Sequence, residues 1–145
     1  MSGVPQVTKS GPKTFVPTEN ILGGQLVEGR AAGRIGVAAA GSLKVLGVAL
    51  TDAQSPDTFA TGPTTVGGFP QINAAPLPTN VAVAYGGIET NVKYLAAATF
   101  GDVLIAAAGG TVTPAGATPD ARTIVGRCTA PAGVAAGAVG LMRTV

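Results

Sequence analysis

The sequence of 145 residues has no histidine and no tryptophan, and no two of its seven carboxylates fall within four positions of each other. Histidine is the side chain most used for proton transfer near neutral pH. No CxxC, HExxH or EF-hand spacing marks a metal site, and no GxxxxGK(S/T) or GxGxxG pattern marks a phosphate-binding loop. These absences predict a protein that is not an enzyme and that holds no cofactor or metal.

The chain is also poor in cysteine and in long apolar runs. The single cysteine, Cys128, excludes a disulfide framework within the chain, and its apolar setting in TIVGRCTA predicts a small buried hydrophobe. The N-terminal MSGVPQVTKSG lacks the apolar core of a signal peptide, and the longest apolar run, 131–142, is too short for a membrane helix. We therefore expect a protein made in a cytoplasm and without membrane contact.

Charge is scarce. Charged residues make up 11% of the chain, whereas roughly 25% is usual. The nine lysines and arginines are spread out and form no basic run, so nucleic-acid binding is not predicted. Alanine, valine and glycine dominate the apolar residues, and small side chains bury little area each. Such a core would gain from further burial against another subunit.

What the chain does have is a succession of short apolar segments separated by glycine and proline. This pattern predicts an all-β protein, a small β-barrel or sandwich, with a single barrel domain over 21–145. The two arms of one expected hairpin are 81–89 and 91–98, with GGIET near its turn, and 111–121 is expected to be a loop. The other expected strands lie within 25–30, 34–41, 43–53, 101–110, 122–130 and 132–145.

Two segments lack a strand pattern. Residues 1–20 read as an extended N-terminal arm, either a disordered tail or an arm that orders on a partner. Residues 54–80 form a long proline-rich loop, expected to be ordered on its own domain or on a neighbour. The side chains in these segments that we expect to contact a partner are Val4, Val7, Lys9, Lys13, Phe15, Val16, Phe59 and Phe69.

One stretch occurs twice. GRIGVAAAG (33–41) aligns with GDVLIAAAG (101–109), sharing the end glycines and the three alanines. Each copy is followed by an apolar strand with a hydrophobic-Gly pair, Leu46-Gly47 and Val125-Gly126. This repetition predicts two related strand pairs in one fold, and chance similarity in an Ala/Gly-rich chain is the alternative.

The segments GGQLVEGRAAGRIGVAAAGSLKVLGVALTDA, YLAAATFGDVLIAAAGG and RTIVGRCTAPAGVAAGAVGLMR resemble those of the capsid decoration (cement) proteins of tailed bacteriophages. The resemblance implies a structural virion protein, synthesised in the host cytoplasm, that binds the outer capsid surface as a homotrimer. There it would stabilise contacts between subunits of the major capsid protein. It implies no catalytic residues, and the 54–80 segment departs from the family pattern.

Two other functions stay open. A different virion component, such as a tail or fibre subunit, would share this composition. A ligand-binding β-barrel would need Phe59, Phe69, Tyr85 and Tyr94 to line one pocket.

Overall fold

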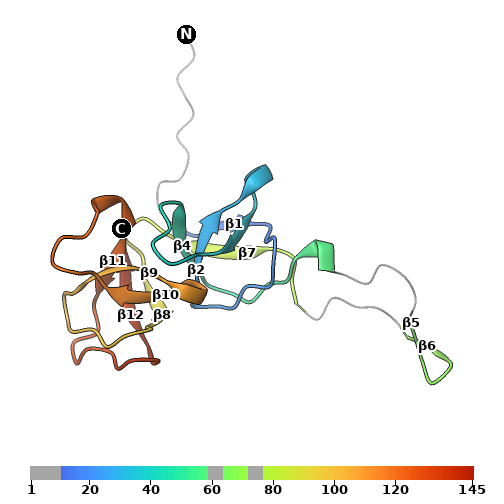
Figure 1. The fold of residues 1–145 in the computed structure, drawn as a ribbon. Coiled ribbons are helices and arrows are strands. Elements are labelled where there is room, and N and C mark those ends of the chain that lie inside the picture. The colour runs from blue at the N-terminus through green and yellow to red at the C-terminus, as the bar shows by residue number, and fades with distance from the viewer. Residues whose placement is uncertain (1–10, 59–63, 72–76) are drawn as a thin grey trace, which may run out of the picture.

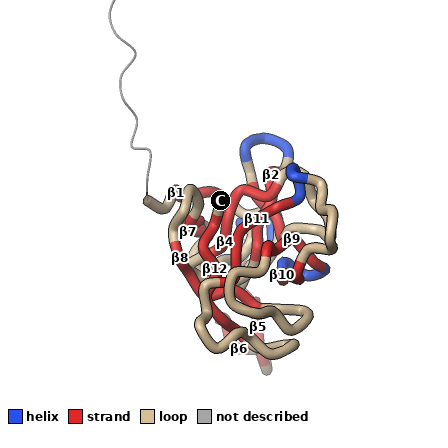
Figure 2. Tube along the Cα trace, turned by 90° about the vertical axis from the view of Figure 1, so that its left-hand side faces the viewer, coloured by secondary structure: helices blue, strands red, loops and turns tan. Residues whose placement is uncertain are grey.

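The computed structural model describes residues 11–58, 64–71 and 77–145. These residues contain no α-helix, and their helical turns are short 3-10 turns between strands (Figure 2). The strands are β1 (Lys13–Phe15), β2 (Leu26–Gly29), β3 (Ile35–Val37), β4 (Val45–Ala49), β5 (Thr64–Val66), β6 (Phe69–Gln71), β7 (Val81–Ala84), β8 (Glu89–Lys93), β9 (Val103–Ala107), β10 (Thr111–Pro114), β11 (Ile124–Cys128) and β12 (Val139–Thr144).

Ten of these strands form two five-stranded antiparallel sheets that lie side by side (Figure 1). The first sheet has the order β1-β7-β4-β2-β3 and the second has the order β10-β9-β11-β12-β8. The predicted all-β class is confirmed, as an arrangement consistent with a small sandwich. The sheets are not closed into a barrel, because their edge strands do not pair as ladders. The two edges of each sheet meet at an isolated parallel bridge, Pro17 with Ile35 and Tyr94 with Val112.

Two predictions of secondary structure are wrong. The expected hairpin over 81–98 does not form, because β7 pairs with β1 and β4 in the first sheet while β8 pairs with β12 in the second. The Gly86-Gly87 pair therefore carries the chain from one sheet to the other. The expected loop over 111–121 begins with strand β10, which pairs with β9. In both cases long-range pairing decides the structure, and local sequence does not show it.

The two sheets are two copies of one unit. Written in chain order, the first unit is β1, β2, β3, β4 and β7, and the second unit is β8, β9, β10, β11 and β12. In both units the strands are arranged third, second, fourth, fifth, first across the sheet. The two parallel bridges also correspond, since each joins the end of the first strand to the third strand. The prediction of related halves is therefore confirmed over five strands rather than two.

Backbone angles extend this correspondence to single residues. The turn Ala31–Gly33 contains Ala32 at φ 58°, ψ 28°, and the turn Ala108–Gly110 contains Gly109 at φ 69°, ψ 26°. The residues before the two turns, Arg30 and Ala107, have φ −117° and −114° with the same ψ of 176°. Ala31–Gly33 and Ala108–Gly110 are therefore equivalent.

The same β-bulge occurs in both units. In the first, Val27 faces Gly47 and Glu28 faces Val45, so one residue of β4 is skipped. In the second, Leu104 faces Gly126 and Ile105 faces Ile124, with the skip at the same point of β11. The predicted equivalence of the Leu46-Gly47 and Val125-Gly126 pairs is thus correct.

The predicted alignment of 33–41 with 101–109 is out of register. In the structure, Gly101 corresponds to Gly24, because the N–H of each donates to a carbonyl of the fourth strand, Ala49 O at 2.7 Å and Cys128 O at 2.8 Å. Gly33 corresponds to Gly110 instead. The two runs of alanine are identical in sequence but do not occupy equivalent positions in the structure. The equivalent positions are set by the turns and the β-bulge that both units contain.

Each unit has a core of small apolar side chains. Ile21, Val27, Ile35, Ala49, Ala53, Val81 and Val83 form the first core. A second, larger cluster holds the equivalents in the second unit, such as Leu104, Val112 and Met142, together with Leu26 and Val48 of the first. Cys128 is buried at the position equivalent to Ala49, which confirms its prediction as a small core residue. The second cluster joins the two units.

Part of the predicted arm and part of the predicted long loop have regular structure. Lys13–Phe15 pairs with β7 as an edge strand, so these residues belong to the first sheet. Within 54–80, Thr64–Val66 and Phe69–Gln71 form a hairpin around Gly67 and Gly68, whose positive φ of 59° and 81° suits a two-residue turn. In Figure 1 this hairpin lies away from the two sheets.

Glu28 is a buried carboxylate that holds the loop after β3. Its Oε1 lies 3.0 Å from Arg30 Nη2, and its Oε2 accepts a hydrogen bond from the Ala39 N–H at 3.2 Å. Burial by itself raises the pKa of Glu28. Hydrogen bonds from Ser42 and Ala39 and the nearby positive charges outweigh this effect, so the net pKa of Glu28 lies below its usual value.

Glu28 should make the fold acid-sensitive. A carboxylate with a lowered pKa in the folded state stabilises the protein above its unfolded-state pKa of about 4.3, and this stability is lost as the pH falls through the folded-state pKa. Glu28→Gln should therefore be less stable than the parent at pH 7 and lose less stability on acidification below about pH 4.3. Urea unfolding from pH 7 to pH 3 measures both. Parallel pH curves for the two proteins would contradict this role.

Gly47 allows β4 to lie against β7. A Cβ at this position would collide with the carbonyl oxygen of Ala84, which is backbone and cannot rotate away. Gly47→Ala should therefore lower the free energy of unfolding by about 3 kcal/mol or more. Gly29→Ala is the matched control, because a Cβ there meets nothing within 4 Å, and its effect should stay within about 1 kcal/mol. Equal effects of the two substitutions in denaturant unfolding would refute the steric explanation.

Candidate interaction surface

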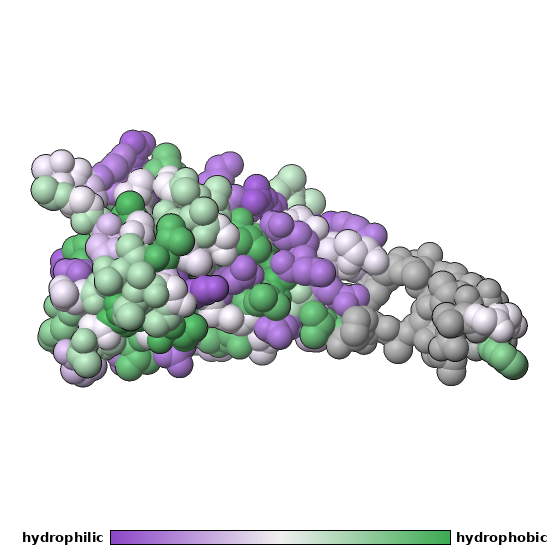
Figure 3. Space-filling view, turned by 60° about the horizontal axis from the view of Figure 1, so that its bottom comes forward, coloured by the Kyte–Doolittle hydropathy of each residue, from purple (hydrophilic) through white to green (hydrophobic). Residues whose placement is uncertain are grey.

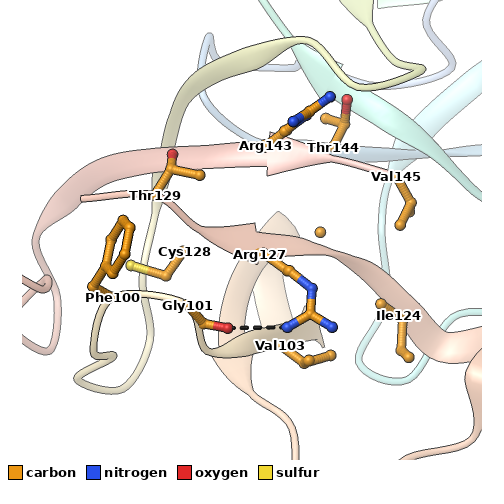
Figure 4. Close-up of a pocket in the computed structure, with 11 residues that line it drawn as sticks. Phe100, Gly101, Val103, Ile124, Arg127, Cys128, Thr129, Arg143, Thr144 and Val145 are labelled. Carbon is orange, nitrogen blue, oxygen red and sulfur yellow. Dashed lines mark hydrogen bonds between the residues drawn. The ribbon is translucent and has the colours of Figure 1, made fainter. Parts of the chain in front are cut away.

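The clearest candidate surface is the outer face of the second sheet. It is a hollow of about 570 Å³ at the meeting of β9, β11 and β12 (Figure 4). The neighbouring strands place Val103 opposite Arg127 and Arg127 opposite Arg143. We call these three residues the open face. Val103 is half-buried, and both arginines are exposed.

Arg127 and Arg143 give the open face its charge. The Nη1 of Arg127 donates a hydrogen bond to the Gly101 carbonyl at 3.2 Å, as the dashed line in Figure 4 marks. Among the described residues, neither arginine has a carboxylate within salt-bridge distance. Like charges on directly opposed residues of neighbouring strands are unfavourable. On its other side Arg143 lies opposite Glu89 of β8, so the unfavourable cross-strand contact is the one between the two arginines.

Apolar groups surround the two arginines. Phe100 is 65% exposed and Val145 is 73% exposed at the rim, and Ile124 is half-buried. The Cys128 thiol, which also lines the hollow, is buried and has no histidine anywhere in the chain to activate it. The arrangement can hold apolar and anionic groups.

A second hollow of about 620 Å³ lies where the two units meet. Residues Leu22–Gln25 of the first unit form one side, and Asn91, Lys93 and the turn at Gly109 form the other. Leu22, Leu50 and Val139 on its rim are 55%, 41% and 63% exposed. Figure 3 accordingly shows hydrophobic side chains in several separate patches over the molecule.

The structure places four of the eight predicted contact residues. Lys13, Phe15 and Val16 lie at the edge of the first sheet, where the Lys13 Nζ sits 5.4 Å from the centre of the Phe15 ring. Phe15 is half-buried against the first core, and Val16 is 37% exposed. Phe69 is 72% exposed on the hairpin. The other four, Val4, Val7, Lys9 and Phe59, lie outside the described residues.

Of the four aromatic residues suggested for a ligand pocket, Tyr94 and Phe69 do not lie together, and Phe59 lies outside the described residues. Tyr94 is fully buried in the second cluster, where its hydroxyl donates to the Leu141 carbonyl at 2.8 Å. Burial raises the pKa of Tyr94 above its usual value, and a bond with Cys128 adds to the rise. Phe69, by contrast, is exposed on the hairpin. Tyr94 is therefore a structural residue.

Two features are absent from residues 11–58, 64–71 and 77–145. No group of three or more cysteine or carboxylate side chains there could hold a metal ion. No helix in these ranges is long and apolar enough to cross a membrane.

Sequence reasoning missed the open face. Arg127 and Arg143 are the charged positions of two otherwise apolar strands, TIVGRC and VGLMRT, and a charge in such a strand signals a solvent-facing side. The signal does not tell which strands are neighbours. Only the pairing of β11 with β12 brings the two arginines together.

No protein-family model matches the chain, and no curated protein does. Among solved structures, the chain is similar to one described as the head fiber gp8.5 N base in bacteriophage phi29. The match has a TM-score of 0.57 and 17% sequence identity, and it covers 93% of this chain and 93% of the other. At this identity the likeness is one of fold.

Proposed function

We propose that this protein is a structural component of a bacteriophage virion that binds the outer surface of the capsid and stabilises contacts between major capsid subunits. The observation that carries the proposal is the likeness of fold, over nearly the whole of both chains, to the base of a phage head fibre. The resemblance of the sequence to capsid decoration proteins likewise favours the outer surface of the capsid.

Physical features of the surface support a binding role without catalysis. Large apolar side chains, among them Leu22, Leu95, Phe100 and Val139, are more than half exposed on different parts of the two units. Where such groups line one hollow, as Leu22 and Val139 do, they mark a surface suited to a partner. Several modest contact areas on one rigid body favour multivalent attachment, in which each contact raises the effective concentration for the next. Attachment as a homotrimer would multiply these contacts again.

A second candidate is the base of a fibre attached to the head. The neighbour of known structure is described as a head fibre, and this chain covers its base almost entirely. The two functions differ in copy number and position: a decoration protein covers the lattice, whereas a fibre base occupies selected attachment points. In both, the protein is made in the host cytoplasm, touches capsid protein and needs neither nucleic acid nor a cofactor.

Heads that lack this protein should bind it when it is added back. The expected result is co-sedimentation with expanded heads at saturable stoichiometry and an increased resistance of the heads to heat or chelation. A cryo-electron microscopy map of the reconstituted heads distinguishes lattice-wide decoration from isolated fibre bases. Failure of well-folded protein to bind any form of the heads would refute both candidates.

The N-terminal arm should contribute to attachment without contributing to the fold. Deleting residues 1–10 leaves β1 complete, so the thermal midpoint should change little, while occupancy on the heads should fall. A full-length variant with Val4→Ser and Val7→Ser tests the apolar anchors at constant length. Unchanged occupancy in both variants would show that the arm plays no part in binding.

A further inference from the structure

The second unit docks on one face of the first unit. This covered face consists of Leu26, Val48 and Ala84, which lie opposite one another on β2, β4 and β7 and are completely buried. Leu26 and Val48 belong to the cluster that joins the two units. The interface between the units is therefore built on an apolar ladder across the first sheet.

A defined edge of the second unit makes this contact. The Gly110 N–H donates to Ala38 O at 3.2 Å, and the Gly41 N–H donates to Ala106 O at 3.0 Å. Val125 beside them is only 6% exposed and belongs to the joining cluster. We call Ala106–Gly110 with Val125 the docking edge. Gly110 of the docking edge lies so close to β2 that a Cβ on it would be 2.9 Å from Leu26 O, so this position requires glycine.

Each side of this interface has an unused twin. The open face, Val103, Arg127 and Arg143, occupies the positions of Leu26, Val48 and Ala84 in the second unit.

The twin of the docking edge is Gly29–Gly33 with Leu46, which we call the free edge. Its turn has nearly the same backbone angles as that of the docking edge, and Leu46 is 42% exposed where Val125 is buried. A second copy of the chain could therefore offer its free edge to the open face and repeat the internal interface.

Arginines stand where this repeated contact would need apolar groups. Val48 and Ala84 of the covered face are replaced by Arg127 and Arg143, and Ala107 of the docking edge is replaced by Arg30. Arg30 is partly neutralised by Glu28 at 3.0 Å, but Lys44 lines the same hollow of the free edge. Docking would bury Arg127 and Arg143, neither of which has a salt bridge among the described residues. The free edge could not neutralise them, because its carboxylate, Glu28, is already paired with Arg30. Burying unpaired charge is strongly unfavourable.

We propose that the open face is a self-docking surface that Arg127 and Arg143 keep closed to a second copy of the chain. The contact they prevent is head-to-tail, and a contact of that kind generates rings or open filaments rather than closed dimers. Repeat proteins likewise carry polar outer faces on their outermost units, which stop further units from docking there. This inference does not depend on the proposed function, and a trimer on the capsid would use a different surface.

The direct test restores the residues of the covered face. The double variant Arg127→Val, Arg143→Ala should self-associate in sedimentation velocity, with an association constant at least about tenfold above that of the parent, whereas the parent should not associate through this face. Arg127→Val alone keeps half of the charge and should show an intermediate effect. Thermal unfolding confirms that each variant is folded. A folded double variant that associates no more than the parent overturns the proposal.

Cross-linking distinguishes the predicted contact from unspecific aggregation. Both proteins in this experiment carry Cys128→Ala, since alanine is the residue at the equivalent position 49. One of them also carries Ala32→Cys on the free edge, and the other carries Ala115→Cys beside the open face. With the double variant, a short thiol cross-linker should join the two proteins to each other but neither to itself. Equal cross-linking with the arginines present, or cross-linking of one protein to itself, would contradict the head-to-tail contact.

A second-site substitution supplies the matched control. Leu46→Asp on the free edge should abolish association of the double variant, because it places a carboxylate where the internal interface holds Val125. Leu95→Asp, at an exposed leucine outside both surfaces, should leave association unchanged. If Leu95→Asp disrupts association as strongly as Leu46→Asp, the association is unspecific and the proposal fails.

Discussion

Two backbones approach each other very closely at one point in each sheet, and the rest of the structure depends on this approach. At Gly47 the carbonyl of Ala84 occupies the space of a side chain, and at Gly126 the carbonyl of Arg143 does the same. The adjacent β-bulge shifts the register of the second and fourth strands by one residue. Bulges bend a strand and increase its twist. The curvature lets each sheet enclose its own core of alanine, valine and other small side chains.

A core of this kind explains why the protein is built from two units. Seven side chains fill the first core, and five of them are valine or alanine. Burial contributes about 25 cal/mol per Å² of apolar surface, so small side chains contribute little each. Docking one unit on the other removes a further apolar ladder from water. The two units are alike in backbone but unlike in surface, because one face is covered inside the molecule and its equivalent faces solvent with two arginines.

This difference leaves several distinct surfaces exposed on the two units. The first unit keeps an edge strand and a free edge, the second keeps the open face, and the β5–β6 hairpin stands apart from both (Figure 1). A rigid body with contact groups on several sides can bridge neighbouring subunits of a larger assembly.

Local sequence determined the all-β class, the strand content of most segments, the burial of Cys128 and the equivalence of Gly47 with Gly126. These properties follow from glycine, proline and apolar residues that act over a few positions. The tertiary structure alone decided that β7 and β8 belong to different sheets, that the repeat comprises five strands in another register, and that Arg127 and Arg143 are neighbours. Strand pairing joins residues far apart in the chain, and in a sequence so rich in alanine and glycine many pairings look alike. Only the complete packing of both units selects one of them.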